Sequence, residues 1–368
     1  MGTGPDAQRA RDAQDDIVQG TATKRRLPKR PGWPFACARH AMRPTIRRRS
    51  ARQLLLFTGR SNPALGERIA AELGCRVAPV ALETFANGEV YCRYPESIRG
   101  ADVFIVQTGS PPVNDHLVEL LLMVDAAKLA SAQRITAVLP LYPYARQDKK
   151  SAPREPISAK VVAELLQVTG VDRVLTMDLH AGQIQGFFSI PVDHMTALPL
   201  FAEHFRAQGL HGSGVVCVSP DLGRVKLARR LSRMLGAEIA VANKSRPRHE
   251  VAAVTEVIGD VRGKVALIGD DMIVTGGTIL AAEQALRAAG ARQVRAFATH
   301  PLFTAGALEA LTASGLAEIV VTDTVALEPR ERADKLRVLT VSPLLAQTIR
   351  NVFEDASVSE IFAGQELF

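Results

Sequence analysis

The segment Lys264–Leu286, KVALIGDDMIVTGGTILAAEQAL, constrains the fold more than any other stretch of the chain. Val265–Ile268 form a short unbroken apolar run, which is typical of a central parallel strand. From Ile279 to Leu286 the apolar residues recur at helical spacing instead. The segment therefore predicts a strand, a loop and a helix, which is the repeating unit of a parallel α/β sheet.

The predicted loop has the composition of a phosphate-binding site. The glycines of Thr275–Thr278 (Thr-Gly-Gly-Thr) allow backbone N–H groups to converge, and the threonines add hydroxyl donors beside a helix N-terminus. Asp270 and Asp271 precede it and can accept hydrogen bonds from vicinal ribose hydroxyls. A sugar phosphate satisfies both halves, whereas the alternative is an ordinary tight turn with solvated acids.

From Gln53 onward, short β-rich runs alternate with amphipathic helical stretches, which predicts an α/β fold with mainly parallel sheets. The number of strands suggests two α/β units in tandem. The predicted strands are Leu54–Phe57, Val103–Gln107, Ile135–Leu139, Val174–Met177, Val215–Val218, Ile239–Ala242, Val265–Ile268, Arg295–Thr299 and Ile319–Val321.

Polar residues follow these strands, at the edge of the sheet where open α/β folds bind ligands. His180 comes after one strand and Asp221 after the next, so the two side chains together can hold a divalent cation such as Mg²⁺. Lys244 follows a third strand. Lys244 and Arg246 are two residues apart, so in an extended loop both cations face one side and can stabilise charge on a phosphoryl group.

Two earlier segments suit a nucleotide. Phe85, Asn87, Gly88 and Glu89 combine an aromatic ring, an amide and a carboxylate on one turn, although a plain β-turn before a strand at Val90 is the alternative. The run Tyr142–Lys150 places cations directly after a strand, and its Arg146 guanidinium can engage phosphate oxygens bidentately. A solvated charge run is the alternative for this second segment.

Composition limits the other classes of function. The first fifty of the 368 residues hold twelve Lys/Arg and four Asp, whereas the remaining 318 carry 33 basic and 34 acidic side chains. The basic tail is expected to be a disordered extension, and a targeting peptide or a nucleic-acid-binding arm is a weaker interpretation. No apolar run is long enough to span a membrane. Four cysteines without metal-like spacing favour a reduced, cytoplasmic setting.

The ordered motifs resemble the ribose-phosphate diphosphokinases (phosphoribosyl-diphosphate synthetases) from about Leu54 to the C-terminus. Type I phosphoribosyltransferases share only the last of these motifs. They are GRSNP (59–63), VNDHLVELLLMVDA (113–126), YARQD (144–148), DLHAGQIQGFF (178–188), SPDLG (219–223), NKSRPR (243–248) and GDDMIVTGGT (269–278).

The resemblance implies two tandem phosphoribosyltransferase-like domains, each a mainly parallel sheet flanked by helices. The expected division is an extension over 1–51, an ATP-side domain over 52–196, a ribose 5-phosphate-side domain over 197–347, and a C-terminal helix and tail over 348–368 that packs back on the first domain. The family also implies a homo-oligomer built from dimers, up to a hexamer.

The activity implied is transfer of the β,γ-diphosphate of ATP to the C1 hydroxyl of ribose 5-phosphate, with Mg²⁺ as cofactor. Each predicted site residue then acquires a role. ATP is assigned to Phe85, Asn87, Gly88, Glu89, Arg146 and Gln147; Mg²⁺ to His180 and Asp221; catalysis to Lys244 and Arg246; ribose 5-phosphate to Arg246, Asp270, Asp271, Val274, Thr275, Gly276, Gly277 and Thr278.

Several positions depart from the family pattern. Val274 stands where an Asp is usual, Arg224 where a second glycine is common, Ser245 where Arg is frequent, and Asn243 where Asp is usual. The loss of a carboxylate at Val274 predicts weaker ribose 5-phosphate binding in an active enzyme. Two alternatives remain open, which are a catalytically silent regulatory homologue and a type I phosphoribosyltransferase.

Overall fold

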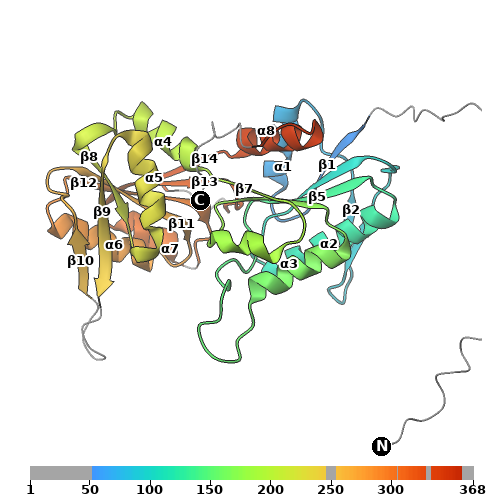
Figure 1. The fold of residues 1–368 in the computed structure, drawn as a ribbon, viewed down its shortest axis with the longest axis horizontal. Helices are drawn as coiled ribbons and strands as arrows, with labels where there is room; N and C mark the ends of the chain where they lie inside the picture. The colour runs from blue at the N-terminus through green and yellow to red at the C-terminus, as the bar shows by residue number, and fades with distance from the viewer. Residues whose placement is uncertain (1–51, 246–253, 305, 329–332, 359–368) are drawn as a thin grey trace, which may run out of the picture. The chain divides into compact units, whose positions relative to one another are not determined.

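The computed structural model describes residues 52–245, 254–304, 306–328 and 333–358. The predicted N-terminal extension, Arg246 and the last ten residues of the predicted C-terminal tail lie outside these ranges. The described part is an α/β fold with two mainly parallel sheets flanked by helices, so the predicted fold class is confirmed (Figure 1). No described helix is long and apolar enough to cross a membrane.

The first sheet consists of five parallel strands in the order β1-β4-β5-β6-β7, beside a small antiparallel hairpin of β2 and β3. Its strands are β1 (Leu54–Thr58), β4 (Asp102–Val106), β5 (Arg134–Leu139), β6 (Arg173–Met177) and β7 (Val192–Met195), with β2 (Ala81–Thr84) and β3 (Val90–Arg93) in the hairpin. Its helices are α1 (Pro63–Leu73), α2 (Val113–Leu129), α3 (Ser158–Thr169) and the 3₁₀ turn η1 (Gly182–Phe187).

The second sheet has seven described strands in the order β10-β9-β8-β11-β12-β13-β14, parallel except for the β9–β10 pair. They are β8 (Val215–Ser219), β9 (Glu238–Ser245), β10 (Val254–Ile258), β11 (Val265–Ile273), β12 (Gln293–Pro301), β13 (Leu316–Thr322) and β14 (Leu336–Leu339). The helices are α4 (Leu198–Ala207), α5 (Val225–Leu235), α6 (Gly277–Ala288), α7 (Ala307–Ala313) and α8 (Ser342–Phe353), with 3₁₀ turns η2 (Gly212–Gly214) and η3 (Leu222–Arg224).

Strand β11 is apolar on both sides because helices cover both faces of its sheet. Val265 and Leu267 belong to one core, which also contains Phe201 of α4 and Leu231 of α5. The alternate residues of the strand pack in a second core with α6 and α7. The central strand is therefore buried on both faces, and Asp270 is its one residue that is partly exposed.

Helix α8 follows the second sheet in sequence but packs beside α1, which belongs to the first half of the chain (Figure 1). Leu345 and Ile349 of α8 share a core with Leu65 and Ile69 of α1. The predicted boundary at 347/348 falls inside this helix. The domain division itself stays a prediction.

All nine predicted strands overlap observed ones, but the predicted end at Ile268 of the strand that begins at Val265 is five residues too early. Strand β11 continues through both acids to Ile273 because its ladder with β12 pairs Asp270 with Ala298 and Met272 with His300. The short strands β2, β7, β10 and β14 were not predicted, and β3 was foreseen only as a strand at Val90. The longer ladder matters for the site, since it holds the two carboxylates on a rigid element.

Candidate active site

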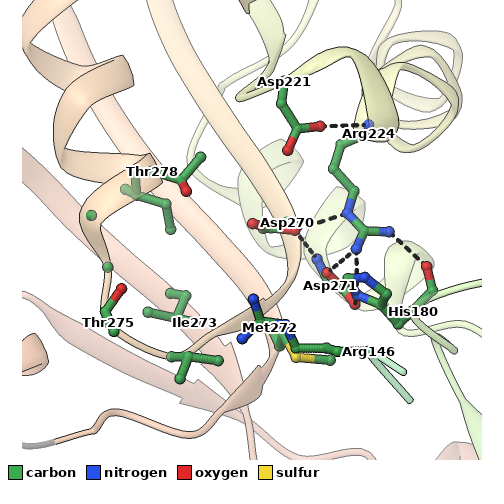
Figure 2. Close-up of a pocket in the computed structure, with 14 residues that line it drawn as sticks. Arg146, His180, Asp221, Arg224, Asp270, Asp271, Met272, Ile273, Thr275 and Thr278 are labelled. Atoms are coloured by element: carbon green, nitrogen blue, oxygen red, sulfur yellow. Dashed lines mark hydrogen bonds and ion pairs between the residues drawn. The ribbon is translucent and has the colours of Figure 1, made fainter. Parts of the chain in front are cut away.

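A pocket of about 240 Å³ opens at the carboxyl end of β11. It gathers side chains that follow strands of both sheets, as expected for an open α/β fold (Figure 2). The lining residues are Arg146, His180, Asp221, Arg224, Asp270, Asp271, Met272, Ile273, Val274, Thr275, Gly276, Gly277, Thr278 and Ile279.

The loop end of this pocket is formed by residues 274–278, which are the turn after β11 (274–276) and the first two residues of α6. Gly276 has φ +72°, which is a left-handed conformation, and a Cβ atom there would lie 3.1 Å from Leu311. Glycine is therefore needed for the turn. Helix α6 begins at Gly277, so its first N–H groups face the pocket. Thr275 and Thr278 line the pocket, and their hydroxyls have no hydrogen-bond partner among the described residues, which leaves them available to an anion.

The acid end contains Asp270 and Asp271, and an arginine lies between them. Arg224 Nε donates to Asp270 Oδ1 at 3.0 Å, and Arg224 Nη2 lies 2.6 Å from Asp271 Oδ1. The same guanidinium donates through Nη1 to the His180 carbonyl at 3.0 Å. Figure 2 shows Arg224 reaching across to both acids and to His180. Arg224 therefore gives both carboxyl groups a charged partner within the protein.

Asp271 also contacts His180, whose Nδ1 lies 2.8 Å from Asp271 Oδ2. Both oxygens of Asp271 are thus used by side chains of the protein. Asp270 uses Oδ1 for Arg224 and for the backbone N–H of Asp271, at 3.0 and 2.8 Å. This leaves its Oδ2 for a ligand.

The two acids have opposite pKa shifts. Burial raises the pKa of Asp270 to about 8, and the neighbouring Asp271 carboxylate contributes in the same direction. Burial also acts to raise the pKa of Asp271, but hydrogen bonding from His180 and the charge of Arg224 outweigh it and hold that pKa below its usual range. Asp271 is therefore the member of the pair that stays ionised.

Polar side chains next to His180 in the structure fix the backbone at the acid end. Asp178, at φ +38°, accepts hydrogen bonds from the Ala197 N–H at 2.9 Å and the Thr299 hydroxyl at 2.6 Å. His194 accepts from the N–H of Leu179 at 2.8 Å. Since these contacts fix the backbone on both sides of residue 179, they determine where His180 enters the pocket.

Asp221 is the N-cap of the 3₁₀ turn η3. Its Oδ1 accepts from the N–H groups of Gly223 at 2.8 Å and Arg224 at 3.1 Å, so Oδ2 is the oxygen left for a cation. His180 has the hydrogen-bonded carboxylate behind one ring nitrogen that metal-binding histidines usually have. No group of three or more metal-ligating side chains occurs among the described residues. His180 and Asp221 thus fit a two-ligand site that substrate phosphates must complete.

Comparison with known proteins identifies the family. Residues 54–170 match the N-terminal domain of ribose phosphate pyrophosphokinase, and residues 236–363 match the phosphoribosyl synthetase-associated domain. The chain is 48% identical over 307 residues to the ribose-phosphate pyrophosphokinase of Fusobacterium nucleatum, which covers 83% of this chain and 97% of that protein. This chain belongs to the ribose-phosphate pyrophosphokinase family.

Two further family members give the same result. The ribose-phosphate pyrophosphokinase of Streptomyces coelicolor is 46% identical over 322 residues, or 87% of this chain and 99% of that protein. The crystal structure of phosphoribosylpyrophosphate synthetase from Mycobacterium smegmatis matches with a TM-score of 0.77 and 45% identity, covering 83% of this chain and all of the other. The predicted family resemblance is therefore confirmed.

The predicted ATP residues divide between two places. Arg146 lines the pocket, whereas Phe85, Asn87, Gly88 and Glu89 do not. The latter form the turn of the β2–β3 hairpin, in which Asn87 Oδ1 accepts from the Glu89 N–H at 3.2 Å and the Phe85 ring is half exposed. The turn named as an alternative is therefore present. Any ATP-binding role of the hairpin stays a prediction, as does that of Gln147, whose Oε1 accepts from Ser158.

The predicted catalytic cations lie at or beyond the limit of the described residues. Lys244 belongs to β9, where its backbone pairs with Thr255 of β10, and its side chain is outside the description. Arg246 is entirely outside it. The roles assigned to both stay predictions for a member of the pyrophosphokinase family.

Sequence analysis did not identify Arg224 as a site residue, although it recorded the position as a departure from the family pattern. Its partners lie 44 to 47 positions away along the chain, at His180, Asp270 and Asp271. The signal that could have found it is the change from a small residue to a cation three positions after Asp221. Val274, another of these departures, packs against the apolar cluster of Leu141, Met272 and Val325.

Proposed function

We propose that this chain is a ribose-phosphate diphosphokinase that transfers the β,γ-diphosphate of ATP to the C1 hydroxyl of ribose 5-phosphate. The C1 oxygen attacks the β-phosphorus, AMP leaves, the hydroxyl proton is released, and the product is 5-phosphoribosyl 1-diphosphate. The observation that carries the proposal is a single pocket that joins an open phosphate loop, an acid pair, and Arg146 with His180 from the first half of the chain. Membership of the family supports it.

Ribose 5-phosphate is placed with its phosphate on the loop of residues 274–278. The N-terminal N–H groups of α6 and the hydroxyls of Thr275 and Thr278 donate to the phosphate oxygens. Asp270 Oδ2 accepts from a ribose hydroxyl. Asp271 supports this arrangement by fixing Arg224 and His180, because both of its oxygens are already used.

ATP is placed on the side of Arg146 and Gln147, with Phe85, Asn87, Gly88 and Glu89 assigned to the nucleotide as in the family. His180 and Asp221 would hold Mg²⁺. The ion, when bound, neutralises phosphate charge and favours attack at phosphorus. Arg146 engages phosphate oxygens through its guanidinium and orients the chain of phosphates.

Lys244 and Arg246 are the proposed catalytic cations. Charge on the transferred group is spread over its oxygens in the transition state, and cations placed there lower the barrier. Lys244 lies near the end of β9, and Arg246 follows two positions later in the sequence.

We further propose a cytoplasmic homo-oligomer built from dimers, up to a hexamer, with ATP and ribose 5-phosphate as its small-molecule partners. Cys75, Cys92 and Cys217 are free thiols, which supports a reducing compartment. Neither a membrane nor a nucleic acid is among the proposed partners.

Phosphorus NMR of the purified protein with ATP, ribose 5-phosphate and Mg²⁺ tests the function. We expect AMP and 5-phosphoribosyl 1-diphosphate to appear in equal amounts, and Lys244→Ala to abolish both while Lys226→Ala, a change at an exposed lysine of α5, leaves both unchanged. ADP in place of AMP, or no turnover at all by the unsubstituted protein, would contradict the proposal.

A second candidate is a regulatory homologue without activity of its own. The apolar packing of Val274 favours it, because the loop then lacks a carboxylate beside the ribose. Silence of the unsubstituted protein combined with activity of Val274→Asp in the same NMR assay would select this candidate.

A further inference from the structure

The strongest unassigned feature of the pocket is the position of the Arg224 side chain. Its side chain is only 16% exposed, and the guanidinium contacts two carboxylates, one ring nitrogen and one carbonyl. Arg224 Nη2 lies 2.7 Å from His180 Nδ1, in addition to its contact with Asp271. The side chain is thus held from several directions at the acid end of the pocket.

The electrostatics of this end require a cation. Asp270 and Asp271 are adjacent in sequence and largely shielded from solvent in the same strand. Ionisation of both carboxyl groups is therefore opposed unless a counter-ion lies beside them. A divalent cation is the usual solution where carboxylates face a phosphate-binding pocket. Here the guanidinium takes that place, with one oxygen of each acid within 3.0 Å of it.

The backbone of Arg224 links the same cluster to Asp221. Its N–H donates to Asp221 Oδ1, and the residue ends η3 directly before helix α5. Gly223 lies close to the same carboxylate, because a Cβ atom there would lie 3.2 Å from Asp221 Oδ1. One residue therefore ties the acid pair to both proposed metal ligands without itself being a ligand.

We propose that Arg224 is a positioning residue that serves as the fixed counter-ion of the Asp270–Asp271 pair and keeps free divalent cations from binding to that pair. The acid pair consequently carries no metal of its own, and Asp270 presents Oδ2 to the sugar. The statement about the sugar rests on the proposed function, whereas the exclusion of metal does not.

Binding of Mn²⁺ tests the proposal in the absence of ATP and ribose 5-phosphate, by electron paramagnetic resonance of the free ion. We expect Arg224→Met to bind one additional Mn²⁺ per chain at the acid pair. Its affinity for Mn²⁺ at that pair should be at least roughly tenfold higher than that of the unsubstituted protein. The double variant Arg224→Met/Asp270→Asn should lose that ion again. Arg229→Met, which removes an exposed charge from the adjacent helix α5, should bind Mn²⁺ as the unsubstituted protein does.

Two further measurements make the test independent of how well Arg224→Met folds. Arg224→Lys retains a cation and should gain no ion. The single variant Asp270→Asn, which keeps Arg224, should bind Mn²⁺ as the unsubstituted protein does. Loss of a bound Mn²⁺ on Asp270→Asn alone, or an equal Mn²⁺ affinity in Arg224→Met and the unsubstituted protein, would overturn the proposal. Because no substrate is present, such a result is separate from a failure to form AMP, which would count against the proposed function.

Discussion

The two ends of the pocket are built from one continuous segment but differ in how their polar groups are used. At the acid end, residues 270 and 271 lie in a strand, and Arg224 and His180 occupy three of their four oxygens. At the loop end, Gly276 forms a left-handed turn, and the threonine hydroxyls have no partner among the described residues. One end is therefore preorganised by the protein, whereas the other is open for an anion.

This difference indicates that the acid end contributes mainly to the stability of the fold and the loop end mainly to the affinity for substrate. A polar group that is satisfied internally stabilises the fold, and its removal leaves a buried partner uncompensated. An open donor contributes nothing to the fold but can be used entirely for ligand binding. Substitutions at the acid end should thus change unfolding, and those at the loop end should change substrate binding.

The largest expected effect is at Asp271. Asp271→Asn leaves Arg224 and His180 without their shared carboxylate, so we expect the free energy of unfolding to fall by about 3–5 kcal/mol. Urea denaturation measures it. Asp270→Asn is the matched control and should cost less, because Asp270 uses one oxygen only. Equal losses for the two variants would break the distinction between the acids.

The next effect is at Gly276 in the loop end. Gly276→Ala forces an alanine to φ +72° against Leu311, which displaces the turn, so we expect the KM for ribose 5-phosphate to rise roughly 100-fold. Steady-state kinetics measure it. Gly263→Ala is the control, since Gly263 also has φ +72° but its Cβ would meet no atom within 4 Å. An unchanged KM in Gly276→Ala would mean that the phosphate binds elsewhere.

Much of this arrangement could be predicted from the sequence. The run of Lys264–Leu286 indicates the strand, the helix and the phosphate loop, because each uses a local pattern of apolar spacing or glycine. The role of Arg224 could not be predicted, since it depends on contacts across more than forty positions that only the sheet brings together. The extension of β11 through both acids was missed for the same reason, because pairing with β12 overrides the polar character of the residues.

The third effect is a loss of stability at low pH that comes from His194, the histidine that accepts a hydrogen bond from the N–H of Leu179 beside His180. Burial lowers the pKa of His194 to about 4, and burial also lowers the pKa of His300. Below about pH 6.5 the unfolded state takes up protons that the folded state does not, so stability is lost as the pH falls toward 4. We expect His194 to account for a loss of about 2 kcal/mol between pH 7 and pH 5.

Urea denaturation of His194→Gln at both pH values isolates this contribution, because the variant lacks the titrating ring. His211→Gln, at an exposed position, is the control and should keep the pH dependence of the unsubstituted protein. If the change in free energy of unfolding between the two pH values is as large in His194→Gln as in the unsubstituted protein, the folded state does not depend on a neutral His194.

The smallest effect concerns the boundary between the two ends, at Val274. Val274→Asp restores a carboxylate beside the ribose, and we expect the KM for ribose 5-phosphate to fall about three- to tenfold through a new hydrogen bond. Steady-state kinetics compare it with Val274→Asn, which matches the shape without the charge. A fall of the same size in both variants would attribute the effect to lost packing against Leu141 and Met272 instead.

The central claim is that the loop end of the pocket has open donors for a phosphate, whereas Arg224 and His180 already hold the acid pair. Calorimetric titration of ribose 5-phosphate and of ribose, without nucleotide, tests this claim most directly. The account predicts that ribose 5-phosphate binds at one site per chain at least roughly 100-fold more tightly than ribose, and that Gly276→Ala but not Gly263→Ala removes this advantage. Equal affinity for the two sugars, or an advantage that survives Gly276→Ala, would contradict it.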